Sequence, residues 1–166
     1  MSTLIAFPIL SFIIIFQSAV VSRMPLLHGT SDLIMLTITA WALQDQVKTA
    51  WQWSIIGGLF LGFISALPIS ITVFTYLLIT AFALVLRRRV WQIPILAMFV
   101  VTAVGTLLSH IVSGVFVSIS GASIPILDTL NLITLPSLIL NLIIAVPIYA
   151  LLRDLAEWLH PKELEL

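Results

Sequence analysis

The stretch TLNLITLPSLILNLIIAVPIYALL, residues 129–152, contains no Asp, Glu, Lys or Arg and decides the fold class. Two further stretches, 49–86 and 90–127, are uncharged in the same sense and longer. A helix needs about 20 mostly apolar residues to cross a bilayer core, because each residue rises only about 1.5 Å. With 61% hydrophobic and 8% charged residues, the chain is predicted to be an all-α integral membrane protein.

The composition limits what else the chain contains. The 166 residues contain no charged, Ser-rich or Pro-rich stretch that is long enough to form a soluble domain. We therefore expect a single transmembrane domain over residues 1–166. Cysteine is absent, which excludes thiol catalysis and disulfides. We expect no cofactor, no metal and no nucleic-acid partner.

The uncharged stretches and their breaks predict a bundle of six transmembrane helices. Pro68 divides the run 49–86, because proline removes a helical hydrogen bond. Ser31 or Asp32 is predicted to cap the second helix, since both side chains accept hydrogen bonds from free N–H groups. The predicted helices are 3–21, 31–44, 51–66, 69–87, 91–117 and 129–153.

Charge predicts the orientation. Basic residues in short loops favour the cytoplasmic side of the membrane. Six spans with both ends in the cytoplasm leave only Arg23 outside and place all the other Lys and Arg residues inside: Lys48, Arg87, Arg88, Arg89, Arg153 and Lys162. The arginine triplet is interpreted first as fixing the orientation of the chain in the membrane. The alternative is that it contacts acidic lipid headgroups or a cytosolic partner. The tryptophans are expected in the cytoplasmic headgroup layer: Trp41, Trp51, Trp53, Trp91 and Trp158. Residues 154–160 are expected to form an interfacial extension.

Polar groups within the predicted spans are few. No Asp, Glu, Lys or Arg is expected at mid-membrane depth, which argues against ion-coupled transport. His110 is interpreted first as a neutral histidine satisfied inside the bundle, and second as part of a polar pocket with Thr106. Ser109 and His110 are adjacent on one helix and point about 100° apart, so intramembrane hydrolysis is not expected.

Small and helix-bending residues predict close helix packing. Gly58, Gly62 and Ala66 form one ladder at four-residue spacing, and small residues let helix backbones approach. A second such ladder has Gly105, Ser109 and Ser113. We favour packing within the chain over packing on a partner. In the last helix, Pro136 and Pro147 should bend the chain, and the Asn141 amide between them must find a hydrogen-bond partner.

These blocks resemble the MreD family of bacterial rod-shape-determining membrane proteins. Residues 135–155, LPSLILNLIIAVPIYALLRDL, resemble the family's last helix. Residues 16–36, FQSAVVSRMPLLHGTSDLIML, resemble its first loop and second helix, with Asp32 matching and Ser31 departing. Residues 57–89 resemble its third and fourth helices, although Ala66 stands where the family commonly has Asp. In the last helix the matching positions are Pro136, Ser137, Asn141, Pro147 and Arg153.

The resemblance implies a non-catalytic scaffold of the cell-elongation machinery in the bacterial inner membrane. Its partner would be MreC, with MreB, RodA and the transpeptidase of RodA as indirect partners and lipids as surroundings. The family's six helices also resemble the substrate-binding subunits of energy-coupling-factor vitamin transporters. The alternative function is therefore a small-molecule-binding transporter subunit, with Thr106, His110 and Asn141 lining the pocket.

Overall fold

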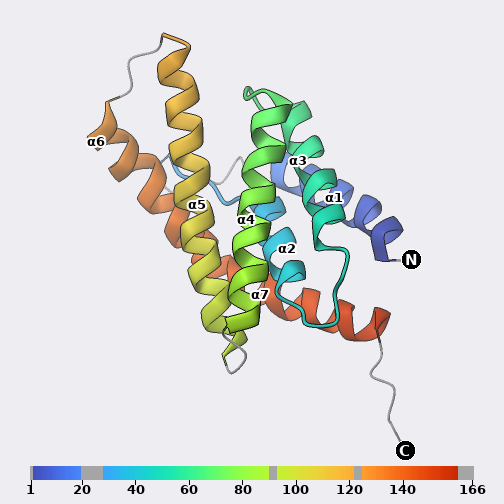
Figure 1. Ribbon diagram of the computed structural model, residues 1–166. Helices are drawn as coiled ribbons and strands as arrows, with labels where there is room; N and C mark the ends of the chain where they lie inside the picture. The colour runs from blue at the N-terminus through green and yellow to red at the C-terminus, as the bar shows by residue number, and fades with distance from the viewer. Residues whose placement is uncertain (1, 20–27, 90–92, 122–124, 161–166) are drawn as a thin grey trace, which may run out of the picture.

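The computed structural model describes residues 2–19, 28–89, 93–121 and 125–160, and every regular element in these ranges is a helix (Figure 1). In chain order the elements are α1 (Ser2–Ala19), α2 (Leu33–Ala42), α3 (Ala50–Ile64), α4 (Ile69–Arg89), α5 (Pro94–Ile119), α6 (Ile126–Thr129), the π-helical η2 (Leu130–Thr134) and α7 (Leu135–Leu159).

Three helices in the described part of the chain are long and apolar enough to cross a membrane. They are α4, α5 and the continuous helix Leu127–Leu159. The apolar helices α1, α2 and α3 are shorter. The chain therefore has the character of a membrane protein, and the number of crossings stays a prediction.

Helix α2 occupies the centre of the molecule. All ten of its residues are buried, and it contacts α1, α3, α4, α5 and α7. Its sequence, LIMLTITAWA, is apolar on every side, as expected for a helix surrounded by others. Ten residues rise about 15 Å, roughly half of a bilayer core. The predicted span 31–44 is thus replaced by a short helix whose two ends must be satisfied by other parts of the chain.

The last predicted helix, 129–153, differs most from the structure. Helix starts at Ile126 and continues to Leu159, so residues 154–159 extend the same helix. The turn begins where the Thr129 N–H donates to the Pro125 carbonyl. The π-helical segment η2 lies just before Pro136, a position where a ring without an N–H disturbs the regular ladder. Figure 1 shows α7 crossing the other helices obliquely.

Helices α3 and α4 pack closely through glycine. A Cβ on Gly58 would lie 2.8 Å from the Val73 Cα, and one on Gly62 would lie 2.9 Å from the Ile69 Cα. The structure thus places these two glycines against the backbone of the same chain. The predicted helix 51–66 ends earlier, at Ile64, so Ala66 lies exposed in the turn to α4.

The prediction for the tryptophans was wrong at two positions. Trp41 and Trp53 are fully buried and stack with a centroid distance of 4.3 Å. The Trp41 Nε1–H donates to the Thr49 Oγ1 at 3.2 Å, so the polar edge of the ring needs no headgroup layer. Trp51 and Trp158 are exposed. Trp91 lies outside the described residues.

Candidate functional site

The site is built around the start of α2, inside the bundle. A helix begins with N–H groups that have no partner within the helix, and these are costly to leave unpaired away from water. Asp32 is the N-cap, and its Oδ1 accepts the Met35 N–H at 3.0 Å. The Gln17 Oε1, from α1, accepts the Leu33 N–H at 2.8 Å and the Ile34 N–H at 3.3 Å. Side chains therefore cap a helix that starts among other helices.

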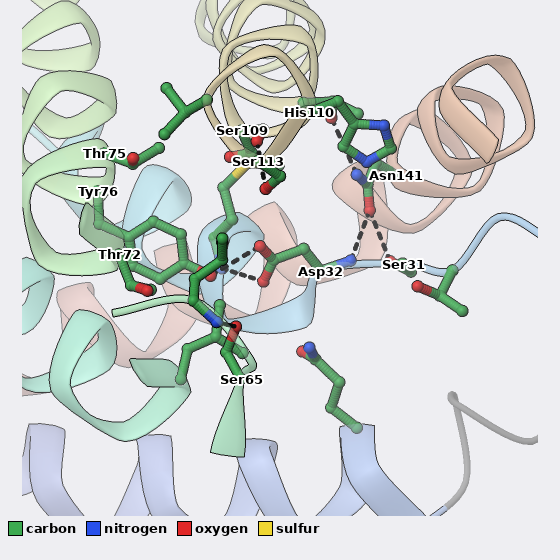
Figure 2. Close-up of a pocket in the computed structure, with 17 residues that line it drawn as sticks. Ser31, Asp32, Ser65, Thr72, Thr75, Tyr76, Ser109, His110, Ser113 and Asn141 are labelled. Atoms are coloured by element: carbon green, nitrogen blue, oxygen red, sulfur yellow. Dashed lines mark hydrogen bonds between the residues drawn. The ribbon is translucent and has the colours of Figure 1, made fainter. Parts of the chain in front are cut away.

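Asn141 of α7 joins this start to two other helices (Figure 2). Its Oδ1 accepts the Ser31 hydroxyl at 2.8 Å and the Asp32 N–H at 2.9 Å. Its Nδ2 donates to the Thr106 Oγ1 of α5 at 2.9 Å. Thr106 in turn donates to the Thr102 carbonyl at 2.8 Å. One amide thus connects α2, α5 and α7.

One turn earlier in α7, a second contact holds the segment that enters α2. The Ser137 Oγ accepts the Thr30 N–H at 3.0 Å. Gly29 lies against α7 so closely that a Cβ there would be 2.5 Å from the Ser137 nitrogen and 2.7 Å from the Pro136 Cβ. The role of Gly29 was not predicted, because its partners lie far along the sequence.

The structure brings one acidic side chain, Asp32, among the helices, whereas no Asp, Glu, Lys or Arg was expected at mid-membrane depth. The half-buried Asp32 carboxylate lies against Tyr76 of α4, whose hydroxyl donates to Oδ2 at 2.7 Å. The network around it reaches Thr106 and Asn141, which lie near the middle of the two longest apolar helices. Sequence analysis placed Asp32 at a helix cap but not inside the bundle. The N-terminal end of the α2 dipole favours this negative charge.

A polar cavity of about 220 Å³ adjoins the network (Figure 2). Five predicted candidates line it together: Thr106, Ser109, His110, Ser113 and Asn141. The Ser109 Oγ is buried and has no hydrogen-bond partner among the described residues. Eight further polar residues line the cavity and were not predicted as a site, although a polar position in apolar surroundings was the available signal: Gln17, Thr30, Ser31, Asp32, Ser65, Thr72, Thr75 and Tyr76. The remaining lining residues are apolar, namely Met35, Leu61, Leu67 and Val112.

His110 lies at the boundary between this cavity and a second one. Its Nδ1 is 2.9 Å from the Thr134 Oγ1 of η2. It lines both the polar cavity and an apolar groove of about 530 Å³ between α5 and the segment around η2. His110 thus has a hydrogen-bond partner inside the bundle, which agrees with the first interpretation. It also lines a polar cavity, which agrees with the second.

The other predicted candidates lie away from the cavity. Gly105 packs against Met35 and Ile79, and Pro147 is exposed on α7. Arg87 is half-buried at the opposite end of α2. Its Nη1 donates to the Ala42, Gln44 and Val47 carbonyls at 3.1, 2.6 and 3.2 Å. Arg88 and Arg89 are exposed. Only the first arginine of the triplet caps the carbonyl end of α2.

The polar groups of the site are mostly engaged in hydrogen bonds with one another. The Asp32 carboxylate is engaged by a helix cap and a tyrosine, and His110 is engaged by Thr134. Among the described residues, no group of three or more His, Cys, Asp or Glu side chains is placed to hold a metal ion. The site offers hydrogen-bond donors and acceptors in a space for a small polar group.

Comparison with known proteins yields no match. No family model, no curated protein and no solved structure matches the chain.

Proposed function

We propose that the chain is a non-catalytic membrane scaffold of the MreD type that binds MreC in the cell-elongation machinery. The supporting observation is that two of the three sequence blocks behind the resemblance, 16–36 and 135–155, meet in one network. Asp32 and Ser31 of the first block bond to Asn141 of the second across 109 and 110 positions. Thr30 bonds to Ser137 across 107 positions.

The roles of these residues favour a scaffold over an enzyme. The hydrogen bonds hold α2, α5 and α7 in a fixed arrangement. The Thr134 hydroxyl, which lies 2.9 Å from the His110 Nδ1, joins η2 to α5 in the same way. The proposed setting is the bacterial inner membrane with both termini in the cytoplasm. MreC would contact the chain directly, and MreB, RodA and its transpeptidase would be reached through MreC.

Co-expression tests this proposal. The tagged chain is purified in mild detergent together with full-length MreC or with an unrelated single-span protein of the same length. We expect MreC at a one-to-one ratio and none of the unrelated protein. Equal recovery of the two single-span proteins, or recovery of neither, would contradict the scaffold function.

The polar cavity favours a second candidate, a substrate-binding subunit of a vitamin-type transporter. Thr106, His110 and Asn141 line one cavity of about 220 Å³. A solute-binding subunit needs such a pocket with several convergent polar groups. The measurement is thermal unfolding of the purified chain with vitamin-sized solutes. A saturable stabilisation by one soluble compound, with an ATPase module in the native complex, would favour this candidate.

A further inference from the structure

The polar cavity and the apolar groove lie side by side and share His110. Both spaces lie toward the end of the bundle where α3 turns into α4 and where α5 ends. Ser65 and Leu67 of the α3–α4 turn line the cavity, and Ser118 and Ile119 at the end of α5 line the groove. A space with one polar and one apolar compartment fits an amphiphilic molecule.

The lining of the cavity indicates the chemistry of the polar part. No Lys or Arg is among the described residues that line it, and Asp32 contributes a carboxylate. An anionic phosphate would therefore find no Lys or Arg partner among the described residues of the cavity. The Ser109 hydroxyl is buried without a hydrogen-bond partner in the described chain, and further hydroxyls and the Asn141 amide surround it. Such groups suit an uncharged headgroup that carries several hydroxyls.

The groove has room for an acyl chain. Apart from His110, it is lined mainly by aliphatic side chains of α5 and by η2. Gly114 faces it, and a Cβ built there would meet no atom within 4 Å. This open position differs from Gly58 and Gly62, which are closed by α4. Gly114 therefore leaves space beside α5 in the groove, one turn after His110.

We propose that the chain binds a membrane lipid with an uncharged, polyhydroxylated headgroup. The headgroup occupies the polar cavity, an acyl chain occupies the groove, and the linkage between them lies against His110. This proposal does not rest on the scaffold function, since a chain that fails to recover MreC can still bind the lipid.

Native mass spectrometry of the full chain tests the proposal. The protein is purified in a detergent without a sugar headgroup, because alkyl glycosides carry the same chemistry as the proposed ligand. Glucosyl-diacylglycerol, phosphatidylglycerol and phosphatidylethanolamine with identical acyl chains are titrated separately. We expect saturable binding of one glucosyl lipid and at least about tenfold weaker binding of the two phospholipids.

Three variants locate the site. Gly114→Leu fills the groove without a clash and should weaken the glucosyl lipid by at least about tenfold. Ser109→Ala removes one hydrogen bond and should weaken it about threefold to tenfold. Val104→Leu adds bulk at an exposed position of α5 outside both spaces and should change binding less than about twofold.

Several outcomes would overturn the proposal. Equal or tighter binding of phosphatidylglycerol would contradict the assignment of an uncharged headgroup. Binding that Gly114→Leu leaves unchanged would show that the groove is not used. If free glucose or glycerol binds as tightly as the lipid, the groove likewise contributes nothing to binding. If no lipid binds saturably, the proposed lipid site does not exist.

Discussion

The amide of Asn141 holds groups from two other segments, namely the Ser31 hydroxyl, the Asp32 N–H and the Thr106 hydroxyl. Asn141→Leu keeps a similar volume and removes the amide partner of all three groups, while the Thr106 hydroxyl keeps its bond to the Thr102 carbonyl. Hydrogen bonds between helices in membranes contribute about 0.6 to 1.7 kcal/mol each. We therefore expect a loss of about 2 to 4 kcal/mol in the free energy of unfolding in detergent.

The control for this variant lies on the same helix. Ile143 is 65% exposed, so Ile143→Ala removes a side chain that the rest of the protein covers only in small part. Its unfolding should stay within about 0.5 kcal/mol of the unsubstituted chain. Equal losses for the two variants would contradict a network centred on Asn141.

The arginine triplet provides a second residue-scale test. Arg87 donates to three carbonyls at the end of α2, while Arg88 is exposed. Hydrogen bonds from charged groups contribute about 1.5 to 3 kcal/mol. Arg87→Gln should lower the free energy of unfolding by about that amount, and Arg88→Gln should leave it nearly unchanged. Indistinguishable melting curves for the two variants would refute the capping role of Arg87.

Sequence predicted some residues of the site and missed others for a physical reason. Asp32 is recognisable as a helix cap, and an amide at Asn141 within an apolar run must have a partner. The partners themselves come from other helices, as Tyr76 of α4 and Gln17 of α1 show. Spacing along the chain carries no information on which distant helix faces which.

At the scale of elements, the glycines of α3 and α5 have opposite surroundings. Alanine favours a helix over glycine by about 1 kcal/mol at either position. At Gly62 the new methyl would press on the Ile69 backbone at 2.9 Å, whereas at Gly114 it meets nothing. Relative to Gly114→Ala, Gly62→Ala should be less stable by about 1 to 3 kcal/mol in thermal or denaturant unfolding. A difference of the opposite sign would contradict the close α3–α4 packing.

Element boundaries were predictable where strong breakers stand, as at Pro68 between α3 and α4. The central position of α2 was not. A helix that is apolar on every side has the same pattern whether lipid or other helices surround it. The buried stacking of Trp41 on Trp53 follows from that position, so the expectation for these rings failed together with it.

At the scale of the whole molecule, the charge pattern predicts which turns share a side of the membrane. The chain lacks cysteine, so a single introduced cysteine can be labelled without background labelling of other positions in the chain. Asp45, near Arg87, and Ala66, in the α3–α4 turn, are exposed at opposite ends of α3. An impermeant maleimide added outside intact cells should label Ala66→Cys and not Asp45→Cys. Labelling of Asp45→Cys alone, or of both, would contradict the predicted orientation.

For the function, the sequence supports a proposal only as far as the resemblance reaches. Uncharged runs establish the helical membrane character, and short apolar motifs suggest a family. Which surface meets a partner depends on side chains brought together from separate helices, such as those at His110, where the polar cavity meets the groove. That arrangement exists only in three dimensions.

The central claim is that this bundle is a scaffold for a single-span partner. The most direct measurement is purification of the tagged chain from its native membranes in mild detergent, with all bound proteins and small molecules identified by mass spectrometry. We expect MreC in stoichiometric amount and no ATPase module. An ATPase module with a soluble vitamin-sized compound, and no MreC, would contradict it.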